Sequence, residues 1–303
     1  MKSVNTLEED RLKEVWEGLD ISNNFMFFRV MQKEGICKRL IEILLDVKVS
    51  KIVHHEQEHV IDNKKDGKAV RLDVYLEDTD RVFNLEMQVG ENNNLAKRSR
   101  YYQAMIDLDL LDSGDDYNTL KASVVVFICR FDPFGEGMAE YLFENSCIGD
   151  KKVIKLGDLT RKVFYNAPAF SKMSKKDVSD FLRFVCGEAV EDNPFIREIV
   201  NEVKEIKRRD EWREEFMRTS MIEMDAELRG EQKGIQIGKQ EGIQLGKQEG
   251  IYKSIEIMRD FSASEENIVS QLMEKFSLTK EESENYLSDF NNGVLKVKKI
   301  SSF

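Results

Sequence analysis

Two neighbouring runs of alternating apolar and polar residues constrain the fold of this chain most. They are VRLDVYLED at residues 70–78 and RVFNLEMQVG at residues 81–90. Successive side chains of a β-strand point to opposite faces of a sheet, so each run has the period of a half-buried strand. The link Asp78-Thr79-Asp80 is rich in turn-forming residues, and the two runs therefore predict an antiparallel hairpin.

The two faces of this predicted hairpin differ in chemistry. Apolar side chains form one face: Val70, Leu72, Val74, Leu76, Phe83, Leu85, Met87 and Val89. Asp73, Glu86 and Gln88 fall on the other face, where two carboxylates and an amide would meet. Such oxygen ligands suit Mg²⁺ or Mn²⁺, ions that polarise a phosphodiester and lower the pKa of a bound water. The alternative is an ordinary solvated face, which antiparallel sheets often have.

The surrounding segments predict an α/β fold in which helices flank a mixed sheet. Further strands are expected near residues 49–61, 122–130, 152–156 and 162–165, with a helix at about 94–111. The run at 122–130 is continuously apolar, which is typical of a central strand buried on both faces. The helix carries an apolar stripe, expected to face inward, that consists of Tyr101, Ala104, Met105 and Leu108.

Several motifs occur together and in a characteristic order. An apolar-flanked Asp in one strand is followed in the next by Glu-x-Gln within LEMQ, and this pair resembles the recombination-promoting nuclease and transposase family (Rpn). That family belongs to the PD-(D/E)XK nuclease superfamily. The resemblance extends to FMFFRVM at 25–31, RSRYYQAMID at 98–107 and VVVFICRFDPF at 124–134, and it includes the Gly-punctuated C-terminal repeats.

This resemblance implies a restriction-endonuclease-like core and a metal-dependent DNA endonuclease, linked to recombination or mobile elements. Asp73 would take the place of the first acidic ligand of Mg²⁺ or Mn²⁺, and Glu86 that of the (D/E) ligand. Gln88 stands where most members of the superfamily carry Lys, and it offers dipoles instead of a positive charge. Gln is usual at this position in the Rpn family. Nothing in these residues favours strand transfer over hydrolysis.

Four residues are candidates for nucleic-acid binding: Lys68, Arg98, Arg100 and Tyr102. Lys68 matches a basic position that is common in the family that this chain resembles, and there it would contact phosphate. The alternative is that Lys68 is an exposed loop lysine without this role. Arg98 and Tyr102 lie four residues apart on the predicted helix and would approach a phosphate and a sugar or base together; the alternative is a solvent-facing pair.

The net charge of −11 opposes strong DNA binding, since DNA affinity comes largely from phosphate neutralisation. We therefore expect weak or metal-dependent binding through local basic clusters.

The chain is expected to have four parts. The nuclease-like core spans 1–170, a helical region packed on or beside it spans 171–229, a Gly-rich repeat spans 230–253, and a small helical interaction module spans 254–303. The repeat consists of GEQKGIQI, GKQEGIQL and GKQEGIYK, so that glycine recurs every four residues. Such glycines cost about 1 kcal/mol each inside a helix. The repeat is a flexible tether or an element for close helix contact in a homo-oligomer. A β-type arrangement with Ile235, Ile237, Ile243 and Leu245 on one face is a further alternative.

An alternative function follows from the missing Lys and the acidic charge. In this alternative the nuclease fold is a non-catalytic scaffold that the C-terminal repeats assemble into an oligomer. Metal binding at Asp73 and Glu86 would discriminate the two, because a scaffold has no need of it.

The remaining sequence features favour a cytoplasmic protein without a membrane segment. The first residues lack the apolar centre of a signal peptide, and no run is long enough to span a bilayer. The four cysteines are scattered, which is typical of reduced thiols and gives no zinc motif. His54, His55 and His59 lie close in sequence, but in a strand His54 points away from the other two, and we do not expect them to bind zinc.

Overall fold

The computed structural model describes residues 4–50, 52, 54–61, 70–91, 93–149 and 152–293. It comprises two compact units, Met1–Thr219 and Ser220–Phe303. Among the described residues, no helix is long and apolar enough to cross a membrane.

The first unit is built from a sheet and the helices that cover it. Its helices are α1 (Val4–Gly18), α2 (Asn24–Met31), α3 (Glu34–Leu45), α4 (Leu95–Leu110), α5 (Lys176–Val185) and α6 (Pro194–Lys207), with short 3-10 helices η1 (Tyr117–Thr119) and η2 (Ala167–Lys172). Its strands are β1 (His54–Ile61), β2 (Val70–Glu77), β3 (Arg81–Gln88), β4 (Ala122–Cys129), β5 (Glu140–Phe143), β6 (Ser146–Ile148), β7 (Val153–Lys155) and β8 (Thr160–Asn166).

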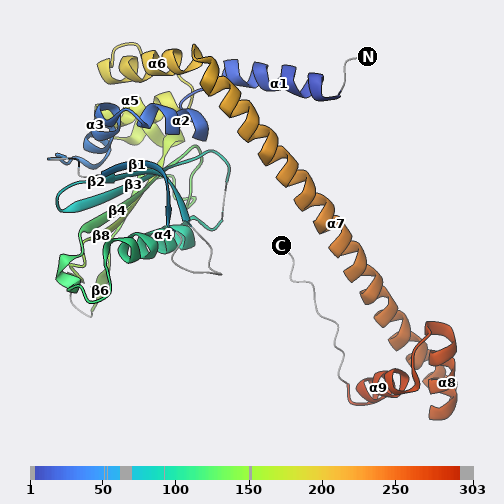
Figure 1. Cartoon of the computed structure of the whole chain (residues 1–303). Helices are drawn as coiled ribbons and strands as arrows, with labels where there is room; N and C mark the ends of the chain where they lie inside the picture. The colour runs from blue at the N-terminus through green and yellow to red at the C-terminus, as the bar shows by residue number, and fades with distance from the viewer. Residues whose placement is uncertain are drawn as a thin grey trace. The chain divides into compact units, whose positions relative to one another are not determined.

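The main sheet is mixed and six-stranded, in the order β1-β2-β3-β4-β8-β5. The predicted hairpin is confirmed, because β2 and β3 pair antiparallel with Val74 opposite Leu85. Strands β3, β4 and β8 are parallel to one another. A parallel neighbour requires a crossover connection, and α4 forms the crossover between β3 and β4 (Figure 1).

Helices cover both faces of the sheet, and this accounts for the composition of β4. Helices α2, α3, α5 and α6 lie on one side and α4 on the other (Figure 1). Val124, Val126 and Ile128 of β4 pack into the larger core with the first group of helices. Val125 and Phe127 pack into the smaller core against α4. The predicted central strand is therefore confirmed, and its continuous apolar run reflects burial on both faces.

The predicted inner stripe of α4 is wrong except for Met105, which is buried. Tyr101, Ala104 and Leu108 are exposed. The inward-facing residues of α4 are instead Leu95, Ser99, Gln103, Met105 and Ile106. This face is partly polar because it covers a polar part of the sheet, where the side chain of Gln103 donates to the Ser123 backbone carbonyl.

Two further expectations differ from the structure. Leu72 was expected on the same face as Val74 and Leu76, but it packs into the smaller core with Tyr75, while Val74 and Leu76 join the larger one. The strand expected at 152–156 exists as β7, but it pairs with β6 in a separate two-stranded ribbon outside the main sheet. Strand β5, at the edge of the main sheet, has a mostly exposed burial pattern and no strong period in its short sequence.

A buried arginine joins α2 to the start of α7 (Asp210–Asp260). The Arg29 side chain is 8% exposed and forms an ion pair with Glu215. Its guanidinium carbon lies 3.9 Å from the ring centroid of Trp212. Cation–π contact and charge pairing reinforce each other here, because the aromatic rings exclude water from the guanidinium.

We expect Arg29→Ala to lower the free energy of unfolding by about 2 kcal/mol, since it removes a buried charge and leaves its partner unpaired. Glu215 keeps a third of its side chain exposed, which limits the loss. Chemical denaturation measures the change. The control is Arg183→Ala, because Arg183 and Glu188 form an exposed pair whose loss is expected to cost less than about 0.5 kcal/mol. Equal effects of the two substitutions would contradict the role of Arg29.

The second unit contains α7 from Ser220 onward, together with α8 (Glu265–Phe276) and α9 (Lys280–Asn291). Ile251, Ile255, Ile268, Leu272 and Leu287 form its small core. Thr279 and Glu282 make the capping box at the start of α9, in which each side chain accepts from the other's backbone N–H.

The glycine repeat lies within helix α7. A Cβ atom added at Gly234, Gly238 or Gly242 would meet nothing within 4 Å. Ile235 and Ile243 are 64% and 63% exposed. No contact with the described residues therefore explains either the glycines or the exposed isoleucines of this segment.

Candidate active site

The candidate site begins where the pairing of β2 and β3 ends. The last recorded pair is Val74 with Leu85, and one further step of the same register would place Asp73 opposite Glu86. Instead of a backbone ladder, the two carboxylates bind the opposing amides. The Asp73 N–H donates to Glu86 Oε1 at 3.1 Å, and the Met87 N–H donates to Asp73 Oδ2 at 3.3 Å. The acids thus satisfy backbone donors that the interrupted ladder would leave unpaired.

Glu86 is held as a buried carboxylate. Its side chain is 1% exposed, and the Asn84 amide donates to Oε1 at 3.1 Å. Burial, and then the neighbouring charge of Asp73, raise the pKa of the Glu86 carboxyl well above its usual range. The hydrogen bonds from Asp73 and Asn84 and the charge of Arg98 act in the opposite direction.

Helix α4 places Arg98 over these residues. Its Nη1 donates to Gln88 Oε1 at 3.0 Å, and its Nη2 lies 3.6 Å from Glu86 Oε2. Nη2 also donates to the Tyr102 hydroxyl at 2.8 Å. Burial, and then the charge of Glu86, raise the pKa of Tyr102. Asp73, Glu86, Gln88, Arg98 and Tyr102 therefore form one connected group.

The chain matches one family model over more than half of its length. The model is described as PD-(D/E)XK nuclease family transposase, and it matches residues 23–227. The chain belongs to this family. No curated protein and no solved structure matches the chain.

The family assignment confirms the resemblance seen in the sequence and agrees with the observed mixed sheet flanked by helices. It supports a nuclease-like function with DNA as the substrate. Nucleases of this kind typically use divalent metals.

The donor set of the candidate site fits a hard divalent cation. Asp73 and Glu86 offer carboxylate oxygens close together, and their mutual repulsion favours a bound positive charge. Among the described residues, no group of three or more His, Cys, Asp or Glu gathers as a metal site. A cation held by two carboxylates is completed by water and substrate phosphate, as Mg²⁺ commonly is.

The other residues expected from the sequence are placed differently. Arg100 is exposed and lies outside the connected group. Lys68 and the side chains of His54, His55 and His59 lie outside the described part of the structure. Asn84 was not expected as a site residue, although its position two residues before Glu86 in a strand places it on the same face.

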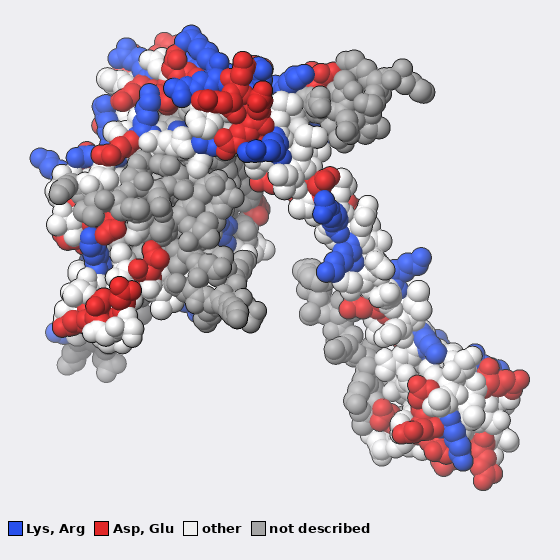
Figure 2. All heavy atoms as spheres, viewed as in Figure 1, with Lys and Arg blue, Asp and Glu red and all other residues white. Residues whose placement is uncertain are grey.

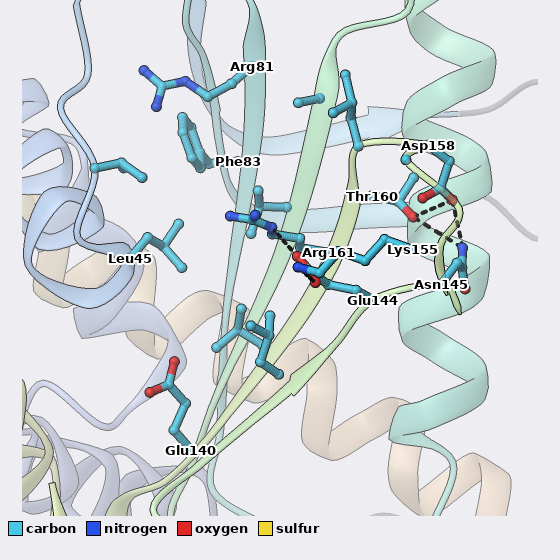
Figure 3. A pocket seen from close by; sticks show the side chains of 17 residues that line it. Leu45, Arg81, Phe83, Glu140, Glu144, Asn145, Lys155, Asp158, Thr160 and Arg161 are labelled. Carbon is cyan, nitrogen blue, oxygen red and sulfur yellow. Dashed lines mark hydrogen bonds and ion pairs between the residues drawn. The ribbon is translucent and has the colours of Figure 1, made fainter. Parts of the chain in front are cut away.

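A separate hollow opens at the other end of the parallel strands (Figure 3). It has a volume of about 390 Å³ and is lined by the first residues of three strands, Arg81, Ala122 and Thr160. Its basic side chains are already paired, since Arg161 and Lys155 both bind Glu144 (Figure 3). Arg81, the third basic side chain of the lining, is paired with Asp78. Among the described residues that line the hollow, none belongs to the connected group of the candidate site.

We expect Glu86→Gln to raise the melting temperature at pH 8 in the presence of EDTA. The folded state raises the pKa of this carboxyl, so the wild-type protein loses stability as pH rises above the ordinary value of 4.5, whereas the amide variant does not. Gln can still accept the hydrogen bonds from Asp73 and Asn84. Thermal melts between pH 4 and 8 should show the gain disappearing toward the acid end. A variant less stable than wild type at pH 8 would contradict this account.

Proposed function

We propose that the protein is a divalent-metal-dependent DNA endonuclease that hydrolyses phosphodiesters, with Mg²⁺ or Mn²⁺ as its cofactor. The observation that carries this proposal is the exchange of hydrogen bonds at the end of the β2–β3 ladder. There each carboxylate accepts a hydrogen bond from a backbone amide of the opposite strand, and these bonds hold the two side chains close together. Holding like charges together costs stability, and a site for a cation accounts for that cost.

In the proposed reaction, a water oxygen forms a bond to phosphorus and the bond from phosphorus to one ester oxygen breaks. The attacking water loses a proton to solvent, and the leaving oxygen takes a proton from solvent. A metal ion bound by Asp73 and Glu86 would stabilise the charge on the phosphate and lower the pKa of the attacking water. Gln88 would orient that water or the ligands around the ion through its amide.

DNA would be held by local basic residues near the site. Arg100 is exposed on α4, and we propose that it contacts the phosphate backbone, as would Lys68. On the face shown in Figure 2, acidic and basic side chains are intermixed over the first unit. With a net charge of −11, binding would depend on few phosphate contacts and on the metal. The free thiols fit a reducing cytoplasm, where we propose that the protein acts.

We expect Asp73→Ala to abolish nicking of plasmid DNA in Mg²⁺ or Mn²⁺, because the cation loses one of its two carboxylates. Nicking assays with Mg²⁺, Mn²⁺ or Ca²⁺ test this, with thermal melting as the check that the fold persists. The matched control is Asp80→Ala in the turn of the same hairpin, where the side chain is 76% exposed and nicking should be unchanged. Divalent-dependent cleavage that survives Asp73→Ala would overturn the site assignment.

A second candidate function is a non-catalytic scaffold that oligomerises. It is favoured by the exposed Ile235 and Ile243 of α7, which no contact in the described part of the chain explains. Calorimetry with Mn²⁺ separates the two functions, because a nuclease binds the ion at Asp73 and Glu86 and loses that binding in Asp73→Ala. A scaffold shows no such binding.

Self-association through the C-terminal region is compatible with either function, and we propose it here. The stretch of α7 at residues 225–244 is exposed throughout and interrupted by glycines, so its helix is marginal alone. Contact with another copy would bury its isoleucines.

We expect the double variant Ile235→Gln, Ile243→Gln to shift the protein toward the monomer in sedimentation velocity, because it removes apolar surface from the contact. The double variant Gln236→Ala, Gln244→Ala, in the same repeats, is the control and should keep the wild-type mass. A monomeric wild-type protein would instead identify the repeat as a tether.

A further inference from the structure

Arg98 differs from an ordinary surface arginine in how tightly it is held. Its side chain is 27% exposed, and its guanidinium carbon lies 5.4 Å from the Tyr102 ring centroid and 5.8 Å from that of Phe127. The Tyr102 ring stacks on Phe127, which in turn stacks on Phe164 of β8. Through these rings Arg98 packs against the core of the sheet.

The donors of that guanidinium are directed at the site. Nη1 binds the Gln88 oxygen, and Nη2 binds the Tyr102 hydroxyl and approaches Glu86. Because Gln88 Oε1 accepts from Arg98, the orientation of the Gln88 amide is determined and its nitrogen is directed elsewhere. The guanidinium charge therefore lies beside Glu86, one of the two acids of the site.

We propose that Arg98 supplies the positive charge of the reaction centre and positions the Gln88 amide, with Tyr102 holding Arg98 in place. This inference rests on the proposed nuclease function and deepens it, since Gln88 itself carries no charge. Hydrolysis places additional negative charge on the oxygens around phosphorus as the water oxygen bonds and the ester oxygen leaves. A fixed guanidinium beside those oxygens stabilises that charge without reorganising during the reaction.

The same position gives Arg98 a second, opposite effect. A guanidinium 3.6 Å from Glu86 competes with a divalent cation for that carboxylate. Removing the charge of Arg98 should therefore tighten metal binding while it slows cleavage. Loss of a merely structural residue would weaken both.

The primary test compares Arg98→Gln with Arg183→Gln in the full-length protein. Both changes remove one positive charge, but Arg183 lies on α5, on the opposite side of the sheet from α4 (Figure 1). We expect Arg98→Gln to slow plasmid cleavage at saturating Mn²⁺ about a hundredfold, the typical effect of losing one preorganised donor. Mn²⁺ affinity, measured by calorimetry, should rise several-fold. Arg183→Gln should change neither.

A charge exchange keeps the proposal falsifiable should single variants be destabilised. Gln88→Lys alone sets two cations against each other and should cleave slowly, whereas Gln88→Lys combined with Arg98→Gln restores one cation and should recover much of the rate. Arg98→Lys should retain more activity than Arg98→Gln. Added guanidinium ion should partly rescue Arg98→Ala.

The outcomes separate this inference from the function on which it rests. A wild-type protein that neither binds Mn²⁺ nor cleaves DNA overturns both. An active wild-type protein with an equally active Arg98→Gln variant overturns the role of Arg98 alone. The role of Arg98 is likewise overturned by weaker Mn²⁺ binding in Arg98→Gln together with no recovery in the exchanged variant.

Discussion

The hydrogen bonds that replace the end of the β2–β3 ladder determine where the site carboxylates lie and where the two strands separate. Beyond Val74 and Leu85, buried amides of both strands need acceptors, and the carboxylates of Asp73 and Glu86 provide them. The acids cannot be removed without leaving amides unpaired, and the strands cannot close without displacing the acids. Backbone geometry and chemistry thus depend on the same two side chains.

The surrounding residues offset the cost of this arrangement in different ways. The Asn84 amide donates to Glu86 Oε1, and the Arg98 guanidinium lies near Glu86 Oε2. They do not fully offset burial and the neighbouring charge of Asp73, since the pKa of Glu86 remains raised. Functional sites commonly depart from the rules that stabilise the rest of a fold. Here the larger core, with Trp16, Phe27 and Phe181 fully buried, supplies stability away from the site.

The sequence predicts the hairpin because apolar and polar residues alternate along both of its strands, and the same alternation places Asp73, Glu86 and Gln88 on one face. It predicts the central strand because the run at 122–130 is continuously apolar. The apolar residues of α4 do not predict its inner face. Arg98, Tyr102 and Gln103 lie on that face because it covers a polar part of the sheet. Asn84 could have been found from its parity with Glu86. The contacts of Arg98 depend on how α4 packs, which no period in the sequence specifies.

All five residues of the connected group come from one continuous segment, from Asp73 in β2 to Tyr102 in α4. The contacts among them close only short loops, whose entropic cost is small. Pairing of β3 with β4, and of β4 with β8, joins parts of the chain much farther apart. The hairpin and its following helix therefore have the low sequence separation of a unit that can assemble early in folding. Insertions in the distant loops or changes in α5 and α6 would then change the stability of the fold around the site. They would change the contacts among the five site residues less.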